Sequence, residues 1–332
     1  MIKASCDIMS VDVGSDSKMM NVIKDTYKTV INSNSVEIDA IVTGKGTRFG
    51  GLEAYEKSFG LGTASIVNFL EQNCGNFKSL RETNLQTGGS KKSVILKGFG
   101  KNGAAAAREL LEMNSHFKIV GITHGGYGIY NQIGIDPEEM SYYLEKHDDR
   151  LEGFSKNVVD EHLIMSRKCD IIIATDKEFS INEELAKTFN CKVFVDGLNA
   201  SPLTFEAESI LLQKKVLIIP SVLSYSGQFI CGYLEWLKNL EHRNLTILFK
   251  RFEKNLRNQF ISMITKRKDQ KEVYEGPTEN ELVITTIQEM MDQAFSNVIE
   301  TAENDGLTLR QAAYSIGLNR VYNHYKEKGI SL

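Results

Sequence analysis

Six residues beginning at Gly98 constrain the fold most, because they form a G-x-G-x-x-G motif between a strand pattern and a helix pattern. The apolar run at 93–97 has the length of a buried strand, and the alanine-rich run at 104–113 has helical spacing. Glycines at such a junction allow a tight turn, close approach of a pyrophosphate and close packing of helix on strand. The helix N-terminus adds amide donors and the positive end of the helix dipole. The motif therefore predicts a Rossmann fold in which the following residues bind a dinucleotide: Gly98, Phe99, Gly100, Lys101, Asn102 and Gly103.

The middle of the chain alternates between apolar runs of strand length and helical patterns. Strands that are apolar on both faces and separated by helices indicate a parallel sheet covered on both sides. We therefore predict an α/β fold, a Rossmann-like doubly wound parallel sheet, followed by a C-terminal helical region. Besides 93–97, strands are predicted at 118–123, 170–174, 192–195 and 216–219, and helices at 16–32, 63–72, 104–113, 182–189, 205–212, 230–240, 243–268, 279–304 and 309–328.

Charge, hydropathy and cysteine usage argue against several kinds of partner and site. The net charge of −4 over 332 residues argues against a nucleic-acid partner, whose phosphates would demand a basic surface. The chain has no run of about 18 apolar residues, so no membrane span is predicted. The five cysteines are odd in number and widely spaced, which supports neither a disulfide framework nor a zinc site. No metal is predicted.

The strand after the glycine motif ends at a position that often carries Asp or Glu, which bonds the adenosine ribose. Here the residue is His124, and no carboxylate follows until Asp136. Two interpretations follow: His124 accepts a 2′-phosphate and the cofactor is NADP, or the ribose anchor has been lost. No Arg or Lys stands beside His124, which favours the second interpretation. NAD, NADP and loss of cofactor binding all stay open.

Collinear blocks over nearly the whole chain carry a resemblance to a known family. Besides the glycine motif, the blocks are Asp25-Thr26-Tyr27, Val42-Thr43-Gly44-Lys45 with Gly50-Gly51, Tyr233-Leu234-Glu235-Trp236-Leu237-Lys238-Asn239-Leu240 and Leu309-Arg310-Gln311-Ala312-Ala313-Tyr314. Together they resemble the hexameric glutamate dehydrogenases, nearest to the animal mitochondrial type, within the Glu/Leu/Phe/Val dehydrogenases. The resemblance implies NAD(P)-dependent oxidative deamination of L-glutamate to 2-oxoglutarate and ammonia.

The same resemblance implies site residues and domains. Asp12 takes the position of the family's proton-relay aspartate, and Ala174 and Asn199 border the cofactor. Family members begin with a substrate domain that holds a catalytic lysine in a Lys-Gly-Gly motif, and we expect that domain to be missing here. The expected domains are a remnant or linker at 1–40, the dinucleotide-binding domain at 41–240, and a helical region at 241–332 with a shortened antenna at about 254–279.

Five departures from the family pattern concern the active site. Tyr55 and Phe59 replace the family's Arg and the Thr that meets the nicotinamide amide. Tyr225 and Gln228 replace the first and last residues of an Asn-Ala-Gly-Gly segment, and Gly232 replaces a Ser that holds the substrate carboxylate. Bulk inserted into a packed site costs about 1–3 kcal/mol, and a displaced hydride donor loses most of its rate. The active site is expected to be degenerate.

These departures favour a non-catalytic subunit, a pseudoenzyme that acts as a structural or interaction component of a homo- or hetero-oligomer. One alternative is an active NAD(P)-dependent glutamate dehydrogenase whose first domain is absent from this chain. Another is a non-catalytic regulator that binds NAD(P) through the glycine motif. The cysteine usage indicates a reducing compartment, and the location is mitochondrial by resemblance, or cytoplasmic.

Overall fold

A computed structural model describes residues 7–12, 14–31, 36–83, 85, 91–241 and 277–329. Contacts within the chain divide it into two units. The first unit comprises Met1–Glu56 and Ile230–Thr286, and the second comprises Lys57–Phe229 and Ile287–Leu332.

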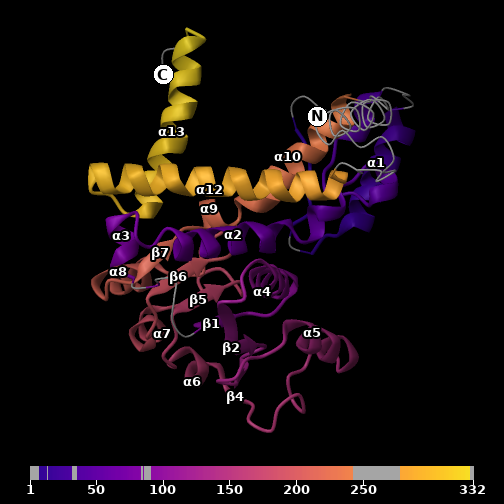
Figure 1. The fold of residues 1–332 in the computed structure, drawn as a ribbon. Helices are drawn as coiled ribbons and strands as arrows, with labels where there is room; N and C mark the ends of the chain where they lie inside the picture. Colours follow the sequence, from indigo (N-terminus) through magenta and orange to yellow (C-terminus); the bar gives the residue numbers. More distant parts are fainter. Residues whose placement is uncertain are drawn as a thin grey trace, which may run out of the picture. The chain divides into compact units, whose positions relative to one another are not determined.

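The second unit is built on a mixed sheet (Figure 1). Among the described residues the strand order is β4-β3-β2-β1-β5-β6-β7; β2, β1, β5, β6 and β7 are parallel, and β3 and β4 extend one edge antiparallel. The strands are β1 (Lys92–Lys97), β2 (Phe117–His124), β3 (Tyr127–Tyr130), β4 (Val159–Asp160), β5 (Ile171–Ala174), β6 (Val193–Asp196) and β7 (Leu217–Ile219).

Helices cover both faces of this sheet, with α2, α4 and α5 on one face and α6, α7 and α8 on the other (Figure 1). They are α2 (Ser58–Gln72), α4 (Lys101–Met113), α5 (Pro137–Lys146), α6 (Glu161–Met165), α7 (Glu183–Thr188) and α8 (Phe205–Gln213). Because both faces are covered, all residues of β5 and β6 are buried. In one core, Ile172 and Phe194 of these strands pack with Leu185 and Leu211. The predicted Rossmann-like α/β fold is confirmed.

The antiparallel edge adds to the predicted parallel sheet. The Gly125-Gly126 turn, with both residues at positive φ, reverses the chain after β2 and returns it as β3. The turn makes a hairpin, so the chain continues beside β2 before it crosses the sheet.

Helix α2 begins five residues earlier than the predicted start at residue 63. Its first turn holds Gly60, where an added Cβ would lie 2.3 Å from the carbonyl carbon of Ala105. The glycine therefore marks close packing of α2 against α4, and not a loop. Sequence propensity alone does not distinguish these two uses of glycine.

Three further helices complete the second unit: α3 (Lys78–Arg81), α9 (Ser221–Ser224) and α13 (Leu309–Glu327). Thr308 and Gln311 form a capping box at the start of α13, in which each side chain bonds the backbone N–H of the other residue. Helices α10 (Ser226–Glu241) and α12 (Glu279–Asp305) belong partly to each unit.

The first unit holds α1 (Ser17–Ile31) and the short 3₁₀ helices η1 (Val36–Ala40), η2 (Thr47–Phe49) and η3 (Glu53–Glu56). Its core includes Met20 and Ile41, with Trp236 packed against it. The side chains of Lys45 and Glu235 are fully buried and form an ion pair of 2.7 Å. This pair joins the segment before η2 to α10.

No helix within the described residues is long and apolar enough to cross a membrane, and these residues hold no cluster of His, Cys, Asp and Glu that could bind a metal. The helix predicted at 243–268 and most of the shortened antenna at 254–279 lie outside the described residues. The predicted domain boundaries stay predictions.

Candidate functional site

The strand order reverses between β1 and β5, which lie side by side although β2 follows β1 in the chain. In open α/β sheets, ligands bind at such a switch point, outside the carboxyl ends of the strands. The last residue of β1, Lys97, pairs with Thr123 of β2 and Ala174 of β5. The three strand ends are therefore level, and the glycine motif begins directly above them.

The loops after β1 and β5 are tied together at Gly98. This residue has a φ of 93°, and an added Cβ would lie 2.8 Å from the Cα of Asp176. The Thr175 hydroxyl donates to the Gly98 carbonyl oxygen at 2.9 Å, and the Gly98 amide donates to the carbonyl oxygen of Thr123 at 3.0 Å. Only glycine fits this backbone without strain or a clash. The start of the motif is therefore held rigidly over the sheet.

The middle of the motif is open by contrast. Gly100 is exposed, and a Cβ added there would meet no atom within 4 Å. Gly100 is the N-cap of α4 and provides no side-chain cap, so amides of the first turn are available to a ligand. Lys101 is exposed and Asn102 is half-buried, whereas Phe99 and Gly103 are buried beneath the loop. The arrangement suits an anion such as a pyrophosphate.

His124, at the end of β2, forms a contact that the sequence did not predict. Its Nε2 lies 3.1 Å from Oδ1 of Asp149, a residue of the loop after α5. The His124 side chain is 15% exposed and that of Asp149 is 74% exposed. Asp149 and its neighbour Asp148 both have positive φ angles, at 61° and 50°. A carboxylate is therefore present at the end of β2, supplied by a distant segment.

A buried lysine lies below the glycine motif. Lys97 is 1% exposed, and its Nζ lies 2.9 Å from Oδ2 of Asp176 and 3.6 Å from Oε2 of Glu161. Both carboxylates compensate the desolvated ammonium. Lys97 is thus engaged by protein carboxylates at the same strand ends that carry the motif.

Two aromatic rings form a buried pair between α2, α4 and the segment after α9. Phe59 of α2 and Tyr225, which follows α9, have ring centroids 5.2 Å apart, and both pack against Ala106 of α4. Phe59 is 2% exposed and Tyr225 is 8% exposed. The neighbouring Ser224 hydroxyl donates to the Asp196 carbonyl oxygen at the end of β6. Tyr225 is therefore fixed beside the carboxyl end of that strand.

The other predicted site residues are distributed as follows. Ala174 is fully buried at the end of β5, and Asn199 is exposed in the loop after β6. Both lie in the second unit with the glycine motif and His124. Asp12 lies in the first unit, where it is exposed and its amide donates to the Ser15 hydroxyl at 2.8 Å. The roles of these residues stay predictions.

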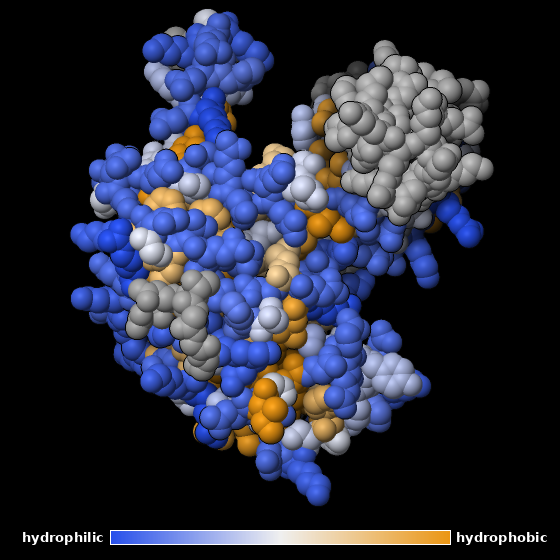
Figure 2. Space-filling view, viewed as in Figure 1, coloured by the Kyte–Doolittle hydropathy of each residue, from blue (hydrophilic) through white to orange (hydrophobic). Residues whose placement is uncertain are grey.

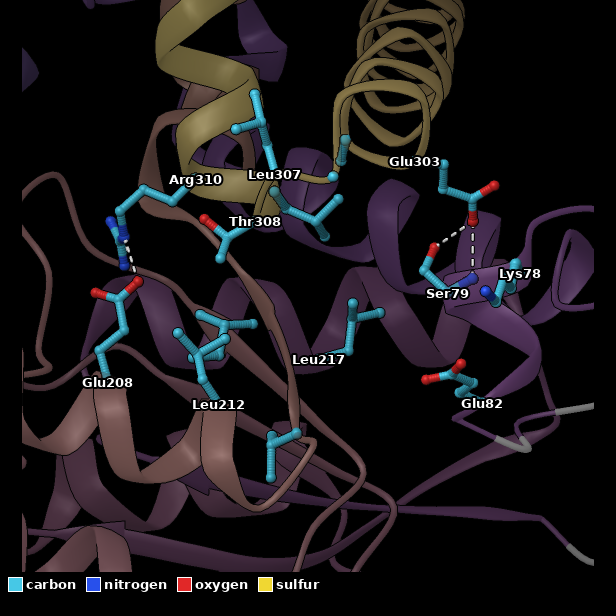
Figure 3. Close-up of a pocket in the computed structure, with 15 residues that line it drawn as sticks. Lys78, Ser79, Glu82, Glu208, Leu212, Leu217, Glu303, Leu307, Thr308 and Arg310 are labelled. Carbon is cyan, nitrogen blue, oxygen red and sulfur yellow. Dashed lines mark hydrogen bonds and ion pairs between the residues drawn. The ribbon is translucent and has the colours of Figure 1, made fainter.

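A cavity of about 320 Å³ lies beside β7, at the sheet edge away from β2 (Figure 3). Arg310 of α13 donates to Glu208 at 2.8 Å and to Asp196 at 3.1 Å, and Glu303 accepts from the amide and hydroxyl of Ser79. Burial raises the pKa of Asp196 above its usual range, although bonds from Ser201 and Arg310 oppose the rise. Arg310 thus joins α13 to α8 and to the end of β6, and Glu303 joins α12 to α3. The rest of the cavity lining is largely apolar.

Comparison with known proteins gives one family. A model of the Glutamate/Leucine/Phenylalanine/Valine dehydrogenase family matches residues 50–329. The mitochondrial glutamate dehydrogenase of Dictyostelium discoideum is 28% identical over 97% of this chain and 64% of its own. The NAD-specific glutamate dehydrogenase of Staphylococcus aureus (strain COL) is 26% identical over 97% of this chain and 66% of its own. The chain thus spans about two thirds of the length of these relatives.

Solved structures give the same fold. The hetero-hexameric glutamate dehydrogenase from Thermus thermophilus, in a Leu-bound form, aligns over 100% of this chain and 67% of its own, with a TM-score of 0.75 and 22% identity. The glutamate dehydrogenase from Peptoniphilus asaccharolyticus aligns over 99% of this chain and 67% of its own, with a TM-score of 0.69 and 21% identity.

Proposed function

This chain belongs to the Glutamate/Leucine/Phenylalanine/Valine dehydrogenase family, and from that premise we propose that it is a dehydrogenase-like subunit that does not transfer hydride. It acts as a structural or interaction component of a larger assembly. The observation that carries the proposal is the buried contact between Phe59 and Tyr225, because the resemblance places Phe59 where family members have the Thr that meets the nicotinamide amide.

The physical argument is one of space. Hydride transfer needs the nicotinamide ring within about 3–3.5 Å of the reacting carbon. A cleft that already holds two packed aromatic rings has to expel or rotate at least one of them before a nicotinamide can enter. Moving a buried aromatic ring into water forfeits several kcal/mol of packing, on the order of the cost of truncating it. The rings therefore oppose the geometry that the reaction requires.

The assembly part of the proposal is supported by α13. Tyr314, Leu318, Val321 and Tyr325 recur at helical spacing on this helix and are 40–67% exposed. Most of the described surface in the view of Figure 2 is hydrophilic, and hydrophobic residues gather in a few patches. An apolar stripe on one helix is typical of a surface that another protein covers. The hetero-hexameric state of the Thermus thermophilus glutamate dehydrogenase is consistent with a homo- or hetero-oligomer.

An activity assay tests the catalytic part. The purified protein is mixed with 2-oxoglutarate, ammonia and either NADH or NADPH, with an active family member as positive control. We expect no consumption of either cofactor above the blank. Consumption that depends on both 2-oxoglutarate and ammonia would refute the proposal and support the alternative, an active NAD(P)-dependent glutamate dehydrogenase.

Native mass measurement tests the assembly part. We expect a mass above that of the monomer, and we expect Leu318→Glu to lower it because the substitution places a charge in the apolar stripe. Asn319→Glu, an exposed neighbour of the stripe, is the matched control and leaves the mass unchanged. A stable monomer for the unaltered protein would contradict the assembly.

A second candidate is a regulator that binds a dinucleotide without turning it over, favoured by the rigid start and open middle of the glycine motif. Loss of cofactor binding would instead favour the purely structural role. The name of the Dictyostelium discoideum relative supports a mitochondrial location, with the cytoplasm as the alternative. Localisation of a tagged protein tests this assignment.

A further inference from the structure

The cavity at the β7 edge of the sheet is formed entirely by residues of the second unit. Its volume of about 320 Å³ is at the lower end of the range for small-molecule pockets. At about 30 Å³ for each water-sized group, the cavity holds roughly ten non-hydrogen atoms. It is therefore large enough for a small organic molecule and too small to enclose a nucleotide.

The middle of the cavity is apolar. Its apolar side chains come from α8, from β7 and the residue before it, and from the turn that leads into α13: Leu212, Val216, Leu217, Ile218, Leu307 and Leu309. Leu212 is 40% exposed, so an apolar chain that covers it removes apolar area from water. Each methylene that a ligand buries there should strengthen binding about fourfold.

Charged side chains lie at both ends of this apolar middle, with Arg310 and Glu208 at one end (Figure 3). The Arg310 guanidinium donates to Glu208 and also to Asp196, so its positive charge is compensated within the protein. This end offers no uncompensated charge to a ligand.

The other end holds Lys78, Glu82 and Glu303 (Figure 3). One carboxylate oxygen of Glu303 accepts from the Ser79 amide at 2.7 Å and from its hydroxyl at 2.8 Å, so Glu303 is held in place. Within the described residues no ion pair joins Glu82 or Glu303 to a cation. Lys78 supplies one positive charge against these two carboxylates. The negative balance attracts an ammonium group and repels a carboxylate.

We propose that this cavity is a binding site for a small amphipathic amine, with its ammonium group at Glu82 and Glu303 and its apolar chain over Leu212 and Leu217. A primary amine with a chain of about eight carbons matches the space for roughly ten atoms. The site uses no residue of the glycine motif, so amine binding and hydride transfer are separate outcomes.

Titration calorimetry of the full chain with octylamine, octanol and octanoate tests the proposal. The three ligands share one chain length, so differences in affinity report the head group. We expect octylamine to bind at least about tenfold more tightly than octanol, because a hydrogen bond between charged groups is stronger than a neutral one. Octanoate should bind more weakly than octanol. Hexylamine, which is two methylenes shorter, should bind about tenfold more weakly than octylamine.

Glu303→Gln should weaken octylamine binding about tenfold and leave octanol binding unchanged. The glutamine oxygen can still accept from Ser79, so the contact between α12 and α3 is retained. Glu300→Gln, an exposed position on the same helix and outside the cavity lining, is the matched control and should change neither affinity. Leu212→Asn should weaken octylamine and octanol alike, because it removes part of the apolar middle.

The proposal is overturned if octylamine gives no saturable heat, if octanoate binds as tightly as octylamine, or if Glu303→Gln binds octylamine as tightly as Glu300→Gln does. Circular dichroism checks that the variants are folded. If Glu303→Gln is unfolded, Glu82→Gln gives the same comparison, because Glu82 is exposed and has no ion pair among the described residues. Turnover in the activity assay would refute the non-catalytic assignment and leave the amine site standing.

Discussion

The rings of Phe59 and Tyr225 lie 5.2 Å apart, centroid to centroid, at an interplanar angle of 58°. Tilted aromatic pairs at this separation are favourable beyond their buried area. The contact joins the first turn of α2 to the segment after α9, and both rings pack on Ala106 of the helix that follows the glycine motif. The pair thus couples the packing of α2, α4 and the segment after α9.

Truncating Phe59 to Ala should therefore have two effects. The free energy of unfolding should fall by about 3 kcal/mol or more, the usual cost of deleting a buried aromatic side chain. The affinity for NADH relative to ADP should rise, because space for the nicotinamide half is created. Chemical denaturation and calorimetry measure these effects. Phe59→Leu is the control, with a smaller loss of stability, and an unchanged NADH to ADP ratio in Phe59→Ala would contradict the assignment of the rings to the nicotinamide side.

Replacement of Gly100 by Ala should abolish nucleotide binding without unfolding the protein. The φ of Gly100 is −79°, and the added Cβ meets no protein atom within 4 Å, so the folded state accepts alanine. The same Cβ occupies space that a diphosphate needs to reach the amides of α4. Gly75→Ala, at another open glycine, is the matched control. Retained ADP affinity in Gly100→Ala would place the ligand elsewhere.

The sequence predicted those parts of the fold that depend on local pattern. The runs at 93–97 and 170–174 became β1 and β5, because strands buried on both faces read as continuous apolar runs. The antiparallel edge escaped prediction because β3 has four residues and β4 has two, too few for a periodic signal. The glycine motif was found because its residues are contiguous.

The contact between His124 and Asp149 could not be predicted in the same way. The two residues are joined by tertiary structure, and the loop that presents Asp149 adopts positive φ at two consecutive aspartates. The sequence itself carries no carboxylate at the end of this strand. The absence of Arg or Lys near His124 was the one sequence signal against a 2′-phosphate, and it agrees with the observed contact.

Lys45 and Glu235 should be energetically coupled, because both side chains are fully buried. Burial lowers the pKa of Lys45, while its contact with Glu235 opposes the change. Lys45→Met leaves Glu235 without its cation and should cost about 3–5 kcal/mol. The double variant Lys45→Met/Glu235→Gln should lose less stability than Lys45→Met, because no unpaired charge is left buried. The neutral Gln can still accept from the Gly44 amide, which donates to Glu235 at 3.0 Å. Chemical denaturation of Lys45→Met, Glu235→Gln and the double variant measures the three losses of stability. A loss in the double variant equal to the sum of the two single losses would contradict the coupling.

Asp170 should make stability depend on pH in the acid range. Burial acts to raise its pKa, but bonds from the Ser93 amide and hydroxyl and from Lys192, each at 2.9 Å, outweigh burial, and the pKa is lowered. A lowered folded-state pKa stabilises the protein above the unfolded pKa of about 4, and this contribution is lost as the pH falls through the folded-state value. Asp170→Asn should therefore reduce the free energy of unfolding by about 1–3 kcal/mol at pH 7 and by progressively less below about pH 4. Urea denaturation from pH 7 to pH 3 measures the difference, with the exposed Glu145→Gln as control. If the difference in free energy of unfolding between wild type and Asp170→Asn stays constant or widens on acidification, the lowered pKa of Asp170 is contradicted.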